Sequence, residues 1–372
     1  MLNDMRILHV VGGLNVGGAE NFLVNLLKYT DTDKYQMHFL CYGQERKFDY
    51  TNEIEKNGGI IHFINTPSII QTKAHLDDIK NFVMEHDAYD IIHIHTLLQS
   101  SVVAYGFSKS SSAKIIVHSH SSQDNSKKTG ILRKFYRVVA KKMIAKYSDL
   151  NIACSKKAGD FLFFKEYLVL NNGVDVLGNQ MKPFIDINNE VPIIIQVGRL
   201  VDVKNHLFSL ELMNDLSTEF DFKFLIIGDG ENRSLIEDYI EKNNLNEKVE
   251  VLGLRDDAIS FMKSADLLIL PSLFEGLPIT LLETQSVGLP SIVSTSVDEL
   301  SDIKLDLIDF INLDDRLSWK KKIIERINDG KSVNYKQISD KFVELKFDIQ
   351  SVSKDICSLY EKVKENEDYD YE

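Results

Sequence analysis

The sequence predicts an α/β protein built from two doubly wound units, and three observations support this. Short apolar, β-branched runs alternate with longer stretches of helical period, which is typical of parallel α/β architecture. At 372 residues, the chain is too long for one ordinary core and suits two domains. Residues 171–192 are rich in Asn, Gly and Pro, which favours an irregular linker between two sets of strands.

The expected strands fall into two sets. The first set covers residues 5–11, 36–42, 90–96, 114–120 and 149–155. The second set covers residues 191–199, 222–230, 248–253, 266–272 and 290–295. We therefore expect an N-terminal domain (1–172), a linker (173–190), a C-terminal domain (191–364) and an acidic tail (365–372). The helical segment at 336–364 is compatible with packing on either domain.

Composition restricts the class of protein and the compartment. The formal charge of −13 argues against binding to nucleic acid. Cys41, Cys154 and Cys357 are odd in number and form no CxxC pair, so we expect buried thiols in a reducing compartment. No stretch approaches the roughly 18 apolar residues that span a bilayer, and the apolar part of the N-terminus is too short for a signal peptide. These features predict a cytoplasmic protein.

A glycine-rich turn follows the first expected strand. Its glycines allow backbone N–H groups to approach an anion or a polar ligand at a helix N-terminus. The GxGxxG frame that starts at Gly12 meets Leu14 where the second glycine should stand, and the second strand ends at Tyr42 without an acid for a ribose. This disfavours an NAD-dependent oxidoreductase. A tight turn needed only for packing is the competing interpretation, but four glycines exceed what one turn requires.

Cations follow a strand of the second half. Arg199 lies just past the strand and Lys204 lies five residues later, where open α/β sheets bind ligands and where a diphosphate needs its charge neutralised. A solvated surface pair is the alternative. A later strand leads to Pro278, which suits the first turn of a helix and leaves the N–H groups of Ile279 and Thr280 free to meet phosphate oxygens.

Two glutamates flank this helix start in the segment "FEGLPITLLE" (274–283). Glu275 precedes the helix, whereas Glu283 lies about one and a half turns into it. Carboxylates that hydrolyse a glycosidic bond face each other at about 5 to 10 Å. The placement of these two instead favours contacts with two hydroxyl-bearing parts of one long ligand, such as a sugar nucleotide.

Several motifs together resemble those of the family 4 retaining glycosyltransferases, especially members that build bacterial capsule and exopolysaccharide. The motifs are "GGAE", "HSH", "NNGVD", "VGRLVDVKNH", "GDGENR", "PSLFEGLPITLLE" and "VGLP", and the resemblance spans about residues 5 to 300. It implies the GT-B fold, in which two Rossmann-like domains face each other across a cleft. It also implies transfer of a hexose or N-acetylhexosamine from a nucleotide-diphosphate sugar, with UDP as the default carrier, to a hydroxyl of a polyprenyl-linked glycan acceptor.

The resemblance also assigns roles to residues. Glu275 binds hydroxyls of the donor hexose, Glu283 binds the ribose, Arg199 and Lys204 stabilise the leaving diphosphate, and His120 lies beside the transferred sugar. Further donor-site contacts are expected from Gly17, Gly18, Gly198, Gly276, Leu277, Ile279 and Thr280. The chain departs from the family in "STSVDELSD" (294–302), where two glycines are usual, and at Thr284, where alanine is common. A sugar-nucleotide-binding protein without activity is the non-enzymatic alternative.

Two histidine pairs raise the question of a metal site. His93 with His95, and His118 with His120, are spaced to share one face of a strand. No cysteine or acid completes such a site, so we expect His93 and His95 to be structural histidines whose hydrogen bonds are satisfied. The DxD motif of metal-dependent sugar transferases occurs only as "DTD" (31–33) and "DYD" (368–370), and both are interpreted as incidental. We therefore expect no metal cofactor.

Residues 127–146 form a basic segment that contains no acid. Its apolar residues follow helical spacing, and Arg133, Arg137 and Lys141 form a separate stripe, as in a basic amphipathic helix. A helix with its apolar face in the core and its basic face in solvent is an equal alternative. The lipid-linked acceptor that the resemblance implies favours an anionic membrane surface as the partner of this segment.

Overall fold

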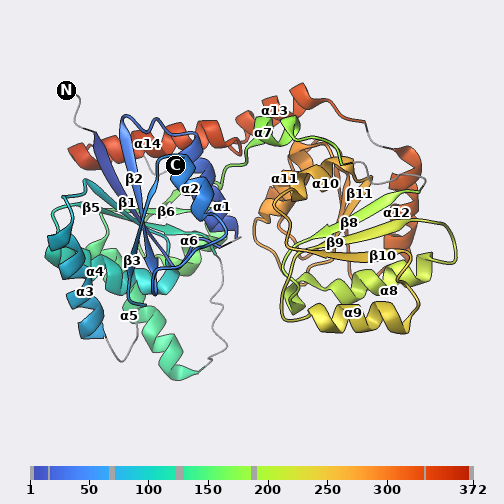
Figure 1. The fold of residues 1–372 in the computed structure, drawn as a ribbon, viewed down its shortest axis with the longest axis horizontal. Coiled ribbons are helices and arrows are strands. Elements are labelled where there is room, and N and C mark those ends of the chain that lie inside the picture. Colours follow the sequence, from blue (N-terminus) through green and yellow to red (C-terminus); the bar gives the residue numbers. More distant parts are fainter. Residues whose placement is uncertain are drawn as a thin grey trace. The chain divides into compact units, whose positions relative to one another are not determined.

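The computed structural model describes residues 4–15, 17–66, 72–121, 130–185, 191–330 and 332–367. The chain divides into two compact units (Figure 1). Unit 1 contains Met1–Gly173 and Ile349–Glu372, and unit 2 contains Val174–Asp348. The "DYD" tail motif and the first three residues of the basic segment lie outside the described residues. Among the described helices, none is long and apolar enough to cross a membrane.

Unit 1 is built on a parallel sheet with the strand order β3-β2-β1-β4-β5-β6-β7. Its strands are β1 (Met5–Val11), β2 (Tyr35–Tyr42), β3 (Ile60–Ile64), β4 (Ile91–Ile94), β5 (Lys114–Ser119), β6 (Leu150–Ala153) and β7 (Leu168–Val169). Its helices are α1 (Gly18–Lys28), α2 (Thr51–Lys56), α3 (Thr72–Glu85), α4 (Ser100–Ser110), α5 (Ile131–Tyr147), α6 (Lys156–Leu162) and α14 (Ile349–Glu365), with the 3-10 turn η1 (Leu97–Gln99). Because helices cover both faces of the sheet, its strands are nearly continuous apolar runs.

Unit 1 has two cores, one on each face of its sheet, and alternate side chains of β1 belong to different cores. Ile7 belongs to the core that α1, α2 and α14 cover, whereas Leu8 belongs to the core beneath α3, α4, α5 and α6. The sheet reverses its strand order between β1 and β4, as doubly wound sheets do. The carboxyl ends of these two strands therefore mark the ligand-binding edge of unit 1.

Unit 2 repeats this plan with the strand order β10-β9-β8-β11-β12-β13. Its strands are β8 (Ile193–Val197), β9 (Lys223–Ile227), β10 (Val249–Gly253), β11 (Leu267–Leu270), β12 (Ser291–Ser294) and β13 (Ile308–Ile311). Its helices are α7 (Val176–Met181), α8 (His206–Leu216), α9 (Arg233–Lys242), α10 (Ala258–Ser264), α11 (Ile279–Ser286), α12 (Arg316–Asp329) and α13 (Tyr335–Glu344), with the turns η2 (Asp202–Lys204) and η3 (Glu299–Ser301). α8, α9 and α12 cover one face, and α7, α10, α11 and α13 cover the other.

The ten expected strands are present, most of them shorter at their ends, and β3, β7 and β13 are additional. Two expectations about domain organisation need correction. The expected C-terminal domain (191–364) is too long, because α14 packs into the core of unit 1, where the side chain of Tyr360 is fully buried. The expected linker is not wholly irregular, because it contains α7, whose first turn is capped by Asp175 accepting a hydrogen bond from Gly178 N at 2.8 Å.

Candidate donor site

The carboxyl edge of unit 2 brings the predicted cation loop next to the predicted glutamate loop. The sheet reverses its order between β8 and β11, which pair directly. The loop after β8 carries Lys204, and the loop after β11 carries Glu275. Since ligands of open α/β sheets bind outside the carboxyl ends of strands at such a reversal, these loops occupy the expected place for a ligand.

Lys204 and Glu275 form an ion pair with 2.5 Å between Nζ and Oε1. Their side chains are only 15% and 16% exposed, so water screens the pair less than it screens a surface pair. Ser272 Oγ donates a hydrogen bond to the same carboxylate oxygen at 3.0 Å. The described contacts of this carboxylate therefore use Oε1.

Hydrogen bonds from the neighbouring strands and loops hold the Lys204 backbone. Gln196 Nε2 donates to the Lys204 carbonyl at 2.9 Å, and Ser209 Oγ fixes Gln196 by donating to its Oε1 at 2.6 Å. Asn205 adopts the left-handed conformation, with φ of 55°, and its side chain donates to the carbonyl of Pro271 at 3.1 Å. The ammonium group of Lys204 is thus carried by a rigid backbone.

Glycines allow the loops after β8 and β9 to approach each other closely. A Cβ on Gly228 would lie 1.9 Å from the carbonyl oxygen of Gly198, and Gly228 also has a positive φ of 144°. A Cβ on Gly230 would lie 2.5 Å from the carbonyl oxygen of Leu200. The "GDG" motif is therefore required by packing next to the cation loop, a role that the motif alone did not reveal.

The helix after the glutamate loop begins slightly later than expected. Pro278 is the N-cap residue of α11 and not its first helical residue. The N–H groups of Ile279 and Thr280 lie in the first turn and therefore have no acceptor within the helix. Glu283 lies in α11 and is partly exposed. The structure thus presents first-turn amides and this second acid on one short helix.

The other predicted donor-site residues of unit 2 lie in the same two loops. Arg199 is exposed and directly follows Gly198, whose added Cβ would lie 3.3 Å from Lys204 Cε. Gly276 and Leu277 are partly buried in the loop before α11. The structure therefore places these residues on the loops that carry Lys204 and Glu275.

The predicted residues of unit 1 lie at the edge marked by β1 and β4. Gly17 is the N-cap residue of α1 and Gly18 is its first residue. His120 follows β5, and its ring centroid lies 5.6 Å from that of Phe22 on α1. Burial lowers the pKa of His120 to about 4, although its hydrogen bond to Asn172 opposes that shift. This imidazole is therefore neutral at physiological pH.

His120 belongs to a largely buried group that we call the five-histidine cluster, and only part of that group was foreseen. Its members are His9, His93, His95, His118 and His120. His95 has both ring nitrogens hydrogen-bonded, as expected. The expectation is only half right for His93, because its Nδ1 contacts Tyr360 Oη at 2.7 Å while its Nε2 has no partner within the described residues. His9 was missed, because a single histidine in an apolar strand gives no signal in the sequence.

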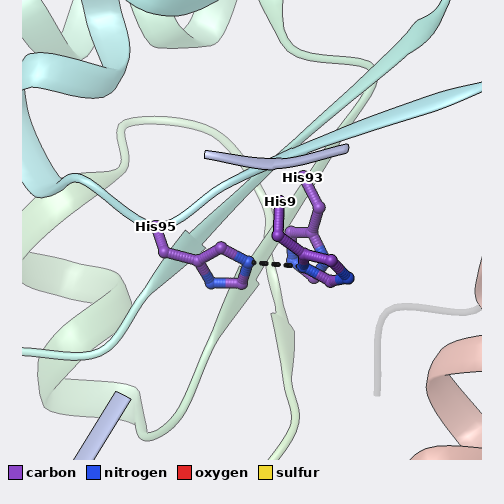
Figure 2. A group of neighbouring side chains, drawn as sticks. All are labelled: His9, His93 and His95. Carbon is purple, nitrogen blue, oxygen red and sulfur yellow. Dashed lines mark hydrogen bonds between the residues drawn. The ribbon is translucent and has the colours of Figure 1, made fainter. Parts of the chain in front are cut away.

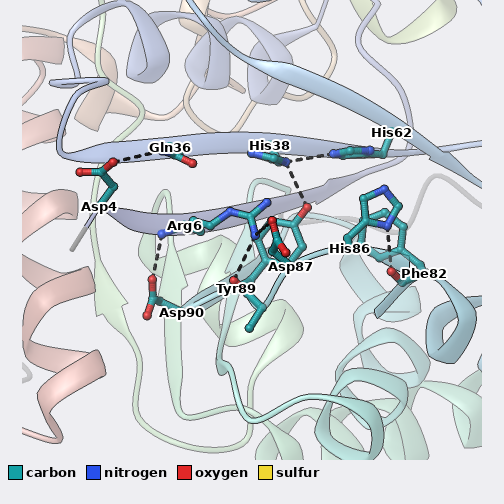
Figure 3. A network of polar contacts seen from close by, with 11 residues as sticks. Asp4, Arg6, Gln36, His38, His62, Phe82, His86, Asp87, Tyr89 and Asp90 are labelled. Carbon is teal, nitrogen blue, oxygen red and sulfur yellow. Dashed lines mark hydrogen bonds and ion pairs between the residues drawn. The ribbon is translucent and has the colours of Figure 1, made fainter. Parts of the chain in front are cut away.

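A second histidine group lies on the opposite face of the unit 1 sheet (Figure 3). His38 Nδ1 contacts His62 Nε2 at 2.9 Å and Tyr89 Oη at 3.0 Å. The Arg6 guanidinium stacks over the Tyr89 ring at 4.9 Å. Burial first, then the neighbouring charged groups, lower the pKa values of His38 and His62 to about 4. This network connects β1, β2 and β3 to the segment that precedes β4.

The three expected buried thiols are confirmed. Cys41, Cys154 and Cys357 are free and buried. Burial raises the pKa of each thiol, to about 12 for Cys41 and to about 11 for the other two. They are therefore protonated and unsuited to act as nucleophiles.

Comparison with known proteins identifies the class of enzyme. The family model described as "Glycosyltransferase Family 4" matches residues 16–176, and the one described as "Glycosyl transferases group 1" matches residues 179–332. The crystal structure of Anabaena Alr3699/HepE in complex with UDP superposes with a TM-score of 0.74 at 16% identity, covering 96% of this chain and 100% of that one. Two Rossmann-like domains with these neighbours define a glycosyltransferase of the GT-B fold.

Curated relatives agree with this class. "Putative glycosyltransferase EpsF" of Bacillus subtilis (strain 168) is 29% identical over 377 residues, covering 96% of this chain and 97% of that protein. An Escherichia coli protein named "UDP-Gal:alpha-D-GlcNAc-diphosphoundecaprenol alpha-1,3-galactosyltransferase" is 24% identical, covering 89% and 90% of the two chains. The chain belongs to the family 4 glycosyltransferases. The alternative of an NAD-dependent oxidoreductase is therefore wrong.

Proposed function

We propose that the protein transfers a hexose or N-acetylhexosamine from a UDP-sugar to a hydroxyl of a lipid-linked glycan, with retention of anomeric configuration, during synthesis of a surface polysaccharide. The observation that carries this proposal is the shielded Lys204–Glu275 ion pair at the strand-order reversal of unit 2. The complex of Alr3699/HepE with UDP supports the carrier, and the name of the Escherichia coli relative supports a diphospholipid-linked acceptor.

The two charges of the pair act on different parts of the donor. Lys204 and the exposed Arg199 neutralise the diphosphate as it leaves, together with the first-turn amides of α11. Glu275 uses Oε2 for a hexose hydroxyl, because Oε1 already contacts Ser272 and Lys204. Glu283 binds the ribose hydroxyls. These assignments for Glu275 and Glu283 rest on the family motif.

Retention follows from attack on the face that the diphosphate leaves. The acceptor hydroxyl approaches an oxocarbenium-like sugar, and a departing phosphate oxygen takes its proton. The protein then contributes positioning and electrostatic stabilisation, and the two cations take over the charge neutralisation that a metal would provide. His120, Gly17 and Gly18 of unit 1 are assigned to the sugar and acceptor side by the same resemblance.

The donor is identified by binding first and by turnover second. We would screen nucleotide sugars by thermal shift, because a ligand at 100 times its Kd stabilises the folded state by about 2.7 kcal/mol. The sugar that stabilises the protein is then incubated with polyprenyl-diphosphate glycans, and the product anomer is read by NMR. A β-linked product from an α-linked donor would refute retention. Stabilisation by every nucleotide sugar tested, without turnover, would favour an inactive binding protein.

A lipid-linked acceptor requires a surface that meets lipid, and α5 is the helix that we propose for it. Between Ile131 and Tyr147 this helix buries only Ala140 and Ile144. Leu132 and Phe135 are 86% and 67% exposed, so its first turns do not place their apolar side chains in the core. Lys and Arg side chains lie between these apolar residues, and the described helix contains no acid. Exposed apolar side chains among cations fit an anionic bilayer interface.

Flotation with anionic vesicles tests the membrane role. Each basic residue near an anionic surface contributes about 1 kcal/mol, so changing Arg133, Arg137 and Lys141 to Glu is expected to release the protein at low salt. Phe135→Ser is expected to weaken binding without loss of stability, because its side chain is exposed.

The control carries the same change of charge on unit 2. Lys223, Lys242 and Lys336 are exposed there, and their replacement by Glu is expected to leave vesicle binding unchanged. Wild-type protein that ignores anionic vesicles at low salt would refute the membrane role and favour a soluble acceptor. Equal losses in both triple variants would point to net charge instead of α5.

A further inference from the structure

The five-histidine cluster lies on the face of the unit 1 sheet that α1 and α14 cover. His9 pairs in register with His93 across β1 and β4, and the other members follow β4 or come from β5 and its end. The rings stack closely, with centroids 4.2 Å apart for His93 and His95 and 4.0 Å apart for His118 and His120. Such a concentration of imidazoles exceeds what the packing of an apolar core requires.

Hydrogen bonds fix the protons of three of these rings. Asn172 Oδ1 can only accept, so neutral His120 carries its proton on Nδ1 and offers Nε2 as an acceptor. His95 Nδ1 donates to that nitrogen at 2.8 Å, and His9 Nδ1 in turn donates to His95 Nε2 at 3.1 Å. The chain ends at His9 Nε2, a fully buried nitrogen without a partner in the described structure. The cluster therefore contains buried lone pairs that its own members do not use.

Three of the rings have the geometry of a metal site (Figure 2). One nitrogen each from His9, His93 and His95 lies within 4.8 Å of the others. The 3.1 Å separation of His9 Nδ1 and His95 Nε2 is close to the roughly 3.4 Å edge of a tetrahedron with metal–nitrogen bonds of about 2.05 Å. An ion between these two atoms would replace one proton with little movement of either ring.

The outer contacts of the rings also suit a metal. Ligating histidines usually hold their second nitrogen in a hydrogen bond. Here Tyr360 Oη contacts His93 Nδ1, and His120 accepts from His95 Nδ1.

We propose that His9, His93 and His95 bind one zinc ion, which is held inside unit 1. Imidazole nitrogens without carboxylate or thiolate select zinc and its first-row neighbours over magnesium or calcium. On binding, the proton on His9 Nδ1 moves to the unpartnered His9 Nε2, and the metal takes the freed lone pair. His95 keeps its proton on Nδ1, so the tautomer of His120 is preserved.

The neighbouring group of His95, His118 and His120 is the competing site, since it meets the same distance limit. In both groups two of the rings are now joined by a hydrogen bond, His9 to His95 in the first and His95 to His120 in the second. We favour the first group because two of its three rings are buried, against one in the second, and because the second contains His120, which the proposed function assigns to the transferred sugar. Variants of His9 and His118 separate the two possibilities, because each residue belongs to one group alone.

The test measures metal binding by full-length protein after purification without a metal-affinity step. Equilibrium dialysis against zinc is expected to give one tightly held ion per chain, and Co²⁺ in its place is expected to give visible absorption of tetrahedral or five-coordinate nitrogen ligation. His9→Phe keeps a ring against Phe39, on which His9 stacks, and is expected to weaken zinc binding more than ~100-fold. Tyr360→Phe, which removes only an outer contact, is expected to weaken it about 10- to 100-fold.

Three controls keep the result interpretable. His118→Phe is expected to retain zinc. The same is expected of His86→Gln, which changes a ring whose centroid lies 4.6 Å from that of His62 in the second histidine group, and of His206→Gln, in unit 2. Wild-type protein that binds no zinc or cobalt would overturn the proposal whether or not the variants fold. Loss of binding in His118→Phe with retention in His9→Phe would overturn it in favour of the neighbouring group. Loss in His86→Gln alone would assign the ion to the other face of the sheet.

Discussion

Replacement of Glu275 by Gln isolates the charge of the shielded ion pair from its shape. Glutamine has the same length, and its Oε1 can still accept the hydrogen bond from Ser272 Oγ. The substitution removes the negative charge opposite Lys204 and one anionic acceptor for a sugar hydroxyl. We therefore expect a folded protein that has lost most of its turnover.

The effect on stability can be estimated from the geometry. Two unit charges 2.5 Å apart attract by about 7 kcal/mol at an effective dielectric constant of 20. Most of this is offset by the desolvation of both ions. Exposed pairs contribute about 0–1 kcal/mol, and breaking a buried pair costs about 3–5 kcal/mol. For side chains about one sixth exposed, we expect a coupling free energy of about 1–3 kcal/mol.

The assay is a double-mutant cycle with Lys204→Met, followed by urea unfolding of the four proteins. Trp319 is the chain's single tryptophan and is fully buried in unit 2, so its fluorescence reports the unit that contains the pair. Glu237→Gln is the matched control, since Arg233 and Glu237 are 40% and 50% exposed and their ion pair is expected to contribute less than about 0.5 kcal/mol. Turnover of Glu275→Gln is expected to fall ~10²–10³-fold. A coupling near zero, or near-normal turnover of the folded variant, would refute the assignment.

The remaining predictions concern the same edge of unit 2. Glu283→Ala is expected to weaken donor affinity with little change in kcat, since ribose contacts are equal in ground and transition states; a pure kcat defect would contradict this. Arg199→Ala is expected to slow transfer strongly, whereas wild-type transfer persists in EDTA; complete loss that magnesium restores would reveal a missed metal at the donor. Gly228→Ala is expected to unfold unit 2 at lower urea, because its Cβ would meet the Gly198 carbonyl; an unchanged midpoint would contradict the packing argument.

Much of the candidate donor site was predictable because its residues directly follow strands that the sequence itself indicates. Strands buried on both faces are continuous apolar runs, and the residues that follow them must lie at the carboxyl edge. Arg199, Lys204 and Glu275 were therefore placed at that edge from their positions after strands. Their pairing was not predictable, because it depends on β8 and β11 being neighbours, although 69 residues lie between Val197 at the end of one strand and Leu267 at the start of the other. The sequence alone does not show which strands become neighbours.

The five-histidine cluster shows the same limit. The spacing of His93 and His95 predicts a shared face, but only the strand order β1-β4-β5 brings His9 and His118 to them. This order depends on crossover connections through α1, α3 and α4, whose apolar periodicity does not encode it. The sequence therefore offered two separate pairs of histidines where the fold assembles one cluster.

The basic segment shows how exposure changes an interpretation. Helical period in residues 127–146 was compatible with a core-facing apolar stripe, because periodicity does not show whether a neighbour covers that stripe. In α5 the buried positions are Ala140 and Ile144, whereas Leu132 and Phe135, two other apolar residues of this segment, are exposed. The basic helix therefore has apolar side chains that no contact within the described part of unit 1 covers. These are the side chains on which the proposed membrane role depends.

The C-terminal helix packs against a sheet that its own sequence does not specify. A helical period is the same whichever sheet a helix packs against, so the sequence left residues 336–364 open to both domains. The structure divides that segment between α13 in unit 2 and α14 in unit 1. α14 covers the sheet face that contains the five-histidine cluster, and Tyr360 contacts His93 there. The last helix thus covers side chains from the first part of the chain, and 267 positions separate the two residues of that hydrogen bond. Unit 1 is therefore completed by residues that follow unit 2 in the chain.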